Sequence, residues 1–309
     1  MHKSDKKYFE RLSEKTRFQR DVLEKVFRLS DLLYMIYENE FLGRRLAIKG
    51  GTAINFIYFK MPRLSVDIDF NFVSDGNRED MLKARENINK ILTKILRMEG
   101  YEIEKVQPYA LLQYNLKYIN TAGNADRIKI EINFMERVPV FEIIEKKIMI
   151  LEKPEFKVRT YMLEELFATK LRALFMRAAA RDLFDVYMLL ESGLEFDKTM
   201  LKKCFIFYFC LADDFRKIST ERISKIDQND IKKFLLPLME KGTKIDINNA
   251  GEKIKAFASE LIVLNKNEQK FIRLFYEEKK AVLDLLFEDV KCNPRLGNHP
   301  MLKWKLRNM

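Results

Sequence analysis

The chain has 309 residues and carries 57 Lys and Arg against 46 Asp and Glu, which gives a formal net charge of +11. Because 47% of the residues are hydrophobic and 33% are charged, the composition argues against a disordered chain and against a membrane protein. No run approaches the roughly 20 consecutive apolar residues of a membrane span, and the N-terminal sequence lacks the apolar segment of a signal peptide. We therefore expect a cytoplasmic protein without a membrane partner. Its basic charge permits a polyanionic partner.

The cysteines and histidines limit the chemistry that the chain can perform. Cys204, Cys210 and Cys292 are odd in number and have no metal-ligand spacing, so we expect reduced thiols rather than disulfides or a zinc site. His2 and His299 are the only histidines and both lie near the termini, which argues against Ser-His or Cys-His nucleophilic catalysis. Any catalysis must therefore use carboxylates, lysine or backbone amides.

Hydrophobic periodicity in the first half of the chain predicts both helices and strands. Apolar residues at three- and four-residue steps predict helices over 16–39 and 78–99. Between them, residues 46–73 predict a short strand, a glycine turn, a helix start and a strand of alternating pattern. Residues 101–118 and 127–134 predict further strands. We therefore expect a mixed sheet with helices packed on it.

After Pro154 the pattern becomes helical to the end of the chain. The predicted helical segments lie near 162–178, 182–191, 197–216, 228–240, 251–264 and 268–289. At roughly 100 to 200 residues per domain, the length predicts two domains. We place their boundary near residue 155, so that the domains are residues 1–155 and 156–309.

A glycine pair stands where the first predicted strand meets the following helix, in the run Lys49, Gly50, Gly51, Thr52. Paired glycines let the backbone approach a ligand closely, and the amides at the start of a helix favour a phosphate. The alternative is an ordinary tight turn, which a glycine pair at a strand end equally allows.

Two acids alternate in the strand that follows, shortly after Arg63 and Ser65. Residues i and i+2 of a strand share a face, so Asp67 and Asp69 present two carboxylates side by side while Ile68 faces the core. Two close carboxylates repel each other unless a cation lies between them, and Mg²⁺ prefers such oxygen ligands. The alternative is a solvated strand edge whose acids pair with Arg63 or another base.

A third acid, Glu131, lies in the alternating segment 127–134 and projects opposite Ile130 and Ile132. A neighbouring strand could bring this side chain beside the aspartate pair as a third metal ligand. Any solvent-facing strand position can also carry a glutamate, so only the topology of the sheet decides between the two interpretations.

In the helical half, Lys170 falls near the apolar stripe of its helix. In one straight helix Lys170 and Asp185 would be roughly 22 Å apart at 1.5 Å per residue, so they share a site only if the helix breaks between them. The run from Arg177 to Asp182 offers such a break, with Asp182 as the N-cap of the next helix. The alternative is an ordinary helical hairpin with ion pairs such as Arg181 to Asp185.

Together these segments resemble the AbiEii/AbiGii toxin family, a branch of the nucleotidyltransferase superfamily related to DNA polymerase β. A hydrophobic-Lys-Gly-Gly-Thr-Ala strand end followed by Arg-x-Ser-x-Asp-hydrophobic-Asp is typical of the family and is matched by residues 48–53 and 63–69. A later Glu-Glu-Leu-x-Ala-x-Lys-hydrophobic-x-Ala-Leu and then Arg-Asp-hydrophobic-hydrophobic-Asp are matched by residues 164–174 and 181–185. The resemblance covers about residues 20–190 and does not extend to the C-terminal third.

The resemblance implies an α+β fold, in which a nucleotidyltransferase-like N-terminal domain has a mixed sheet flanked by helices and an all-helical C-terminal domain follows. It implies that Asp67 and Asp69 hold one or two Mg²⁺ (or Mn²⁺) ions that bind the triphosphate. Glu131 is the candidate third carboxylate and the candidate base for the acceptor hydroxyl. The helical domain would complete the active site and contact the acceptor.

The family's remaining motif residues imply contacts with the nucleotide. The candidate nucleotide-binding residues are Lys49, Gly50, Gly51, Thr52, Arg63 and Ser65. Lys170 would neutralise charge on the triphosphate as pyrophosphate leaves, and Asp185 would orient Lys170 or the incoming nucleotide.

The resemblance also implies a toxin of a type IV toxin–antitoxin pair, with an antitoxin encoded nearby, that transfers NMP from an NTP to a nucleic acid. The 3′ end of tRNA is the expected acceptor. Residues 291–309 contain five Lys and Arg and Trp304 with no acid, which suits phosphate contact and base stacking; the alternative is a frayed terminus. Two other functions stay open: nucleotidyl transfer to a protein or small molecule, and a non-catalytic regulator that binds nucleotide or RNA.

Overall fold

The structure, a computed structural model, describes residues 5–59, 61–74 and 76–309, so that His2 lies outside the described residues. The chain forms two compact units, one of Met1–Arg137, Ile143–Thr160 and Leu236–Thr243 and the other of Val138–Glu142, Tyr161–Leu235 and Lys244–Met309. The division of an active site between two domains stays a prediction.

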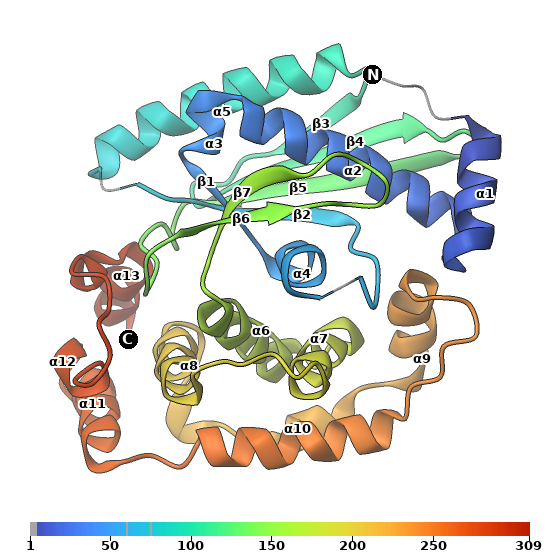
Figure 1. Ribbon diagram of the computed structural model, residues 1–309. Helices are drawn as coiled ribbons and strands as arrows, with labels where there is room; N and C mark the ends of the chain where they lie inside the picture. The colour runs from blue at the N-terminus through green and yellow to red at the C-terminus, as the bar shows by residue number, and fades with distance from the viewer. Residues whose placement is uncertain (1–4, 60, 75) are drawn as a thin grey trace. The chain divides into compact units, whose positions relative to one another are not determined.

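The first unit contains a seven-stranded sheet and its helices (Figure 1). Its elements are α1 Lys6–Thr16, α2 Arg20–Glu38, α3 Glu40–Gly43, β1 Leu46–Lys49, α4 Gly50–Ala53, β2 Asp67–Phe72, α5 Arg78–Met98, β3 Glu102–Val106, β4 Leu111–Ile119, β5 Ala125–Asn133, β6 Ile144–Ile148 and β7 Phe156–Thr160. The strand order is β3-β4-β5-β2-β1-β7-β6. β2 is parallel to β5 and β1 is parallel to β7, while the other neighbours are antiparallel. The predicted mixed sheet with packed helices is confirmed.

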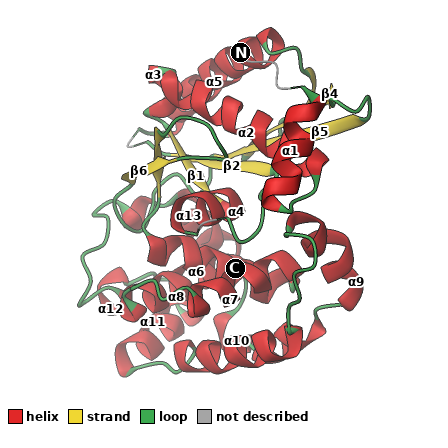
Figure 2. Cartoon of the chain, turned by 45° about the vertical axis from the view of Figure 1, so that its right-hand side comes forward, coloured by secondary structure: helices red, strands yellow, loops and turns green. Residues whose placement is uncertain are grey.

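The two faces of the sheet differ in polarity because side chains alternate along each strand. α2 and α5 lie along one face, as Figures 1 and 2 both show. That face is apolar: Ile68, Phe70 and Ile130 are fully buried, the Phe70 ring packs against Tyr37 of α2, and the Tyr114 hydroxyl donates to a side chain of α5. The opposite face of β2, β5 and β4 carries the polar residues of the alternation.

Local sequence sets the start of the long helix α5. The side chain of Asn77 accepts hydrogen bonds from the first amides of the helix, while Asp80 accepts one from the Asn77 amide, which together form a capping box. Met81, Ile88 and Leu92 then recur at helical spacing and are buried against the sheet. The predicted helix over 78–99 is therefore confirmed.

The second unit is helical. Its helices are α6 Leu163–Arg177, α7 Ala180–Glu191, α8 Lys198–Ala212, α9 Gln228–Asp230, α10 Ile247–Leu261, α11 Lys266–Glu277, α12 Leu283–Leu286 and α13 Pro300–Asn308. The predicted helical C-terminal region is confirmed. Among the described residues, no helix is both long enough and apolar enough to cross a membrane.

One prediction and one alternative for the second half of the chain are wrong. The helical pattern after Pro154 does not begin at once, because 156–160 form strand β7, in which Phe156, Val158 and Thr160 are buried in alternation. A short strand at period two was therefore missed beside a long helical run.

The frayed C-terminus is the second error. Residues 300–308 form α13, which Pro300 and the N-cap His299 initiate, and Leu302 is buried. Trp304 is about half exposed at 49%. The cysteines are free thiols, and Cys204 and Cys210 are buried.

Candidate active site

Strand β2 carries the two predicted carboxylates. Asp67 and Asp69 are partly exposed, whereas Ile68 and Phe70 between and after them are fully buried. The alternation that the sequence predicts is confirmed. The chain therefore places two acids on the polar face of a central strand, where they lie about 7 Å apart along the strand at roughly 3.4 Å per residue.

The glycine turn lies directly against the second of these acids. β1 runs antiparallel to β2, with Lys49 opposite Asp69, so the turn that follows β1 begins at the carboxylate. Gly50 has φ 68°, which favours glycine, and a Cβ at this position would lie 2.6 Å from Asp69 Oδ2. The Gly50 backbone therefore lies directly against the Asp69 carboxylate, which a side chain at position 50 would displace.

Buried side chains support this turn from below. The Thr52 hydroxyl donates to the carbonyl of Asp67 and lies 2.9 Å from Ser65 Oγ. A Cβ on Gly51 would lie 2.6 Å from a guanidinium nitrogen of Arg63, and Thr52, Arg63 and Ser65 are all at least nine-tenths buried. Arg63 therefore packs against the turn in this structure, and contact of Arg63 or Ser65 with a nucleotide stays a prediction. Phosphate contact by the turn stays a prediction.

Lys49, the first residue of the predicted nucleotide-binding run, already has an acidic partner. Its Nζ lies 3.2 Å from Glu136 Oε2, and the Glu136 side chain is only 9% exposed. A contact between Lys49 and a nucleotide stays a prediction.

Replacing Gly50 with alanine tests how closely the turn and the carboxylate are coupled. The new Cβ displaces Asp69 and the residue must keep a left-handed φ. We therefore expect the nucleotide transfer that the sequence predicts to fall about 100-fold, and the free energy of unfolding to fall by about 1 kcal/mol. Gly100→Ala is the matched control, because Gly100 has φ 79° but no atom within 4 Å of its Cβ position. Equal activity of the two variants would show that the Gly50 contact is irrelevant. Initial transfer rates and urea unfolding provide the two measurements.

The sheet brings Glu131 next to the aspartate pair, which the sequence alone could not decide. In the parallel β2–β5 pair, Asp69 is opposite Glu131 and Asp67 is opposite Lys129. Lys129 Nζ lies 3.1 Å from Glu131 Oε2. Burial lowers the pKa of Lys129, but Asp67, Glu131 and Asp69 outweigh it, so the pKa of this lysine lies above its ordinary value. Lys129 is a functional candidate that the sequence analysis missed.

No three His, Cys, Asp or Glu side chains among the described residues are arranged to hold a metal ion. Glu131 pairs with Lys129 in this structure, so a metal-binding role for Glu131 and its role as a base stay predictions. Asp67 and Asp69 remain the candidate metal pair.

In the second unit, Lys170 binds two carboxylates that follow it on the next helix. α6 ends at Arg177, Ala178 adopts φ 47°, and α7 begins at Ala180, so the predicted helix break is confirmed. Lys170 Nζ lies 2.9 Å from Asp182 Oδ1 and 3.1 Å from Asp185 Oδ2. The break therefore brings Lys170 and Asp185 together.

Asp182 has a different role from the one that the sequence predicts. Ala179 is the N-cap of α7, and Asp182 lies in the first turn. Its carboxylate is fully buried and also accepts from Arg177 Nε at 2.6 Å. Burial raises the pKa of Asp182, but Lys170 and Arg177 outweigh it and hold the pKa well below its ordinary value. Asp182 is therefore an ionised partner of Lys170, and its N-cap assignment is wrong.

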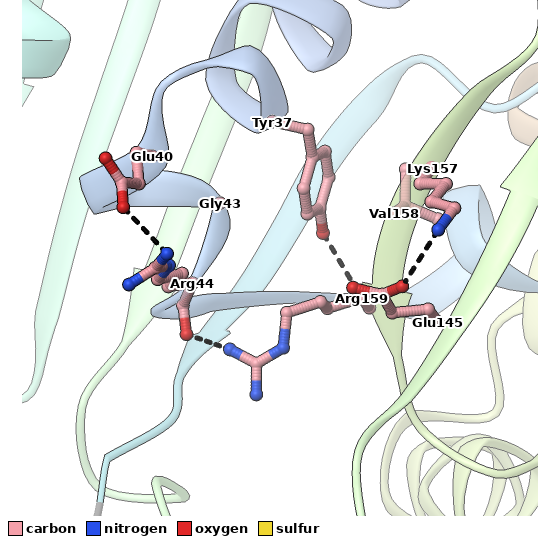
Figure 3. Close-up of a pocket in the computed structure, with 8 residues that line it drawn as sticks. All are labelled: Tyr37, Glu40, Gly43, Arg44, Glu145, Lys157, Val158 and Arg159. Atoms are coloured by element: carbon pink, nitrogen blue, oxygen red, sulfur yellow. Dashed lines mark hydrogen bonds and ion pairs between the residues drawn. The ribbon is translucent and has the colours of Figure 1, made fainter.

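A cavity of about 240 Å³ lies elsewhere in the first unit (Figure 3). It is lined by Tyr37, Glu40, Gly43, Arg44, Glu145, Lys157, Val158 and Arg159. Arg44 pairs with Glu40 at 2.7 Å and Lys157 with Glu145 at 3.5 Å. Gly43 precedes β1 whereas Gly50 follows it, so the cavity lies at the opposite end of β1 from the carboxylates. No predicted site residue lines it.

One comparison with known proteins matches a family model, and another finds a solved structure of similar fold. A family model described as the nucleotidyl transferase AbiEii toxin of the type IV toxin–antitoxin system matches residues 31–262. The fold is similar to that of MenT4, a nucleotidyltransferase toxin from Mycobacterium tuberculosis H37Rv, with a TM-score of 0.68 and 18% sequence identity over 93% of this chain and 100% of that one. The sequence matches no curated protein.

Proposed function

Because the chain belongs to the family of AbiEii nucleotidyltransferase toxins of type IV toxin–antitoxin systems, we propose that it transfers NMP from an NTP to RNA at the Asp67–Asp69 site. The 3′ end of tRNA is the proposed acceptor, and a cognate antitoxin encoded nearby is the proposed partner. The observation that carries the proposal is the contact between the turn and the acid: a Cβ on Gly50 would lie 2.6 Å from Asp69 Oδ2.

The residues at this turn fit a divalent cation. Two carboxylates on one strand face supply the hard oxygen ligands that Mg²⁺ or Mn²⁺ prefers. The adjoining glycine backbone lies directly against one of them, since a Cβ on Gly50 would lie 2.6 Å from Asp69 Oδ2. When bound, such an ion neutralises triphosphate charge and lowers the pKa of an attacking hydroxyl. Asp67 and Asp69 would hold it, while Thr52 and Ser65 keep the turn in place from beneath.

The absence of a catalytic histidine is consistent with this chemistry. Nucleotidyl transfer depends mainly on positioning and charge neutralisation, for which acids, lysines and backbone amides suffice. The roles of Lys170 and Asp185 toward the triphosphate stay predictions, because the structure supports only the ion pair between them.

A basic, partly aromatic surface supports the choice of RNA as the acceptor. The net charge is +11, and on α13 the exposed side chains of Lys303, Trp304 and Arg307 combine phosphate-binding groups with a ring that can stack on a base. We expect RNA binding to weaken as salt rises, with a negative slope of log affinity against log salt concentration.

The proposal is tested by incubating the protein and Mg²⁺ with each of the four labelled NTPs and separate pools of total tRNA, protein and metabolites. We expect label in tRNA, with at least one NTP, and none with Asp69→Asn. Label in protein or a metabolite would move the acceptor to that class. Calorimetric nucleotide binding that ignores Mg²⁺, together with no labelled acceptor, would favour a non-catalytic regulator instead.

A further inference from the structure

The polar face of the sheet contains a positive side chain among its carboxylates. Lys129 is opposite Asp67, and Glu131 is opposite Asp69, in neighbouring parallel strands. Neighbouring strands are about 4.8 Å apart, so each of these pairs has its side chains within interaction range on one face. Three acids and one lysine therefore share a small area that is only partly exposed to water.

Within this group, Glu131 forms an ion pair with Lys129 of the same strand. Lys129 and Glu131 are two residues apart and share a face, and their charged atoms lie 3.1 Å apart. Among the described residues no three His, Cys, Asp or Glu side chains are arranged to hold a metal ion, and this includes Asp67, Asp69 and Glu131. The lysine thus holds the third carboxylate in an ion pair while the two aspartates of β2 lie on the next strand.

We infer that Lys129 is a positioning residue that keeps Glu131 out of the metal site until a divalent cation binds, and that it thereby sets the metal affinity of the site. This inference rests on the proposed function, because it takes the Asp67–Asp69 pair as the metal site. Lys129 lowers the metal affinity of the site in two ways. Its charge opposes a cation nearby, and its ion pair competes with the metal for the Glu131 carboxylate.

The test measures Mn²⁺ affinity by electron paramagnetic resonance on the full chain, without NTP or acceptor. Lys129→Met removes the charge and frees Glu131, so we expect Mn²⁺ to bind about tenfold more tightly than to the wild type. Lys129→Arg keeps the charge and an ion-pair donor, so it is expected to retain the wild-type affinity. Circular dichroism of each variant checks that it is folded.

Lys117→Met is the matched control. Lys117 lies two residues after Asn115, which is opposite Lys129, so it is on the same face, and it pairs with Glu102 at 3.2 Å on the edge strand. Lys117→Met removes one positive charge from the same face of the sheet, as Lys129→Met does, but at a position away from Asp67, Asp69 and Glu131. We expect its Mn²⁺ affinity to stay within about twofold of the wild type, because exposed charges are screened by solvent.

A double-mutant comparison separates the release of Glu131 from the simple loss of charge. The gain in affinity from Lys129→Met is expected to shrink to about twofold when it is made in a Glu131→Gln background. An unchanged affinity of Lys129→Met, or a tenfold gain that persists without the Glu131 carboxylate, would overturn the inference and leave the metal site intact. Wild-type Mn²⁺ binding that does not depend on Asp69 would overturn the proposed metal site itself, and this inference with it.

Discussion

Asp69→Asn is expected to lower nucleotide transfer at least about 1000-fold while the protein stays folded. The substitution keeps the shape of the side chain that lies against Gly50 but removes one of the two negative charges that would hold a cation. Asparagine also avoids a cavity beside the turn, so the loss reports on charge and not on packing. The measurement is the initial rate of labelled NMP incorporation into the acceptor, with thermal melting of both proteins by circular dichroism.

Glu104→Gln is the control for this substitution. Glu104 lies opposite Asn115, which is opposite Lys129, so its side chain is on the same face of the sheet, at the exposed edge strand β3. The substitution therefore removes one carboxylate from that face at a distance from Asp69. We expect its transfer rate to stay within about twofold of the wild type, because a distant exposed charge is screened. Incorporation by Asp69→Asn at the wild-type rate would remove Asp69 from the mechanism.

Much of the aspartate site follows from the local sequence. Because side chains alternate along a strand, the order Asp67, Ile68, Asp69 places both acids on one face. Burial of Ile68 shows that the acids lie on the solvent-accessible face. The Gly50–Gly51 pair likewise predicts a turn by local conformational preference. Such features depend on neighbours in the chain, which is why a single sequence contains them.

Other features depend on contacts between distant segments. The position of Glu131 beside Asp69 is set by the pairing of β2 with β5, which are about 60 residues apart and parallel. The burial of Arg63 follows from the fold of the turn above it. Neither has a periodic signal in the sequence. The short strand β7 was missed because five alternating residues are weak evidence beside a long helical pattern.

The second large effect concerns the stability of the helical unit. Lys170→Met is expected to lower the free energy of unfolding by about 3–5 kcal/mol, because it removes the ammonium that both Asp182 and Asp185 contact. The two carboxylates are fully buried, so water cannot replace the lost charge, and Arg177 contacts Asp182 from an exposed position. Urea unfolding at pH 7 measures the loss.

Lys203→Met gives the matched comparison. Lys203 is also buried, at 2% exposure, but its partner Asp289 has a side chain that is 56% exposed and can be rehydrated. We therefore expect a smaller loss of about 1 kcal/mol, from the ion pair and the hydrogen bond to the Leu286 carbonyl. If the two substitutions cost the same, burial of the acidic partners does not decide the stability of these ion pairs.

The cost of Lys170→Met should also depend on pH in a defined direction. In the wild type the pKa of Asp182 is held below its ordinary value, so its stabilisation is present above the unfolded value of about 3.9 and is lost as pH falls through the folded value. Without Lys170 the effect of burial, which raises the pKa of Asp182, is less strongly opposed, so the Asp182 carboxylate of the variant takes up a proton at higher pH than in the wild type. The stability difference between the two proteins is therefore expected to be largest near pH 7 and to shrink toward pH 4. A difference that stays constant over this range would mean that Lys170 stabilises the unit through packing and not through its charge.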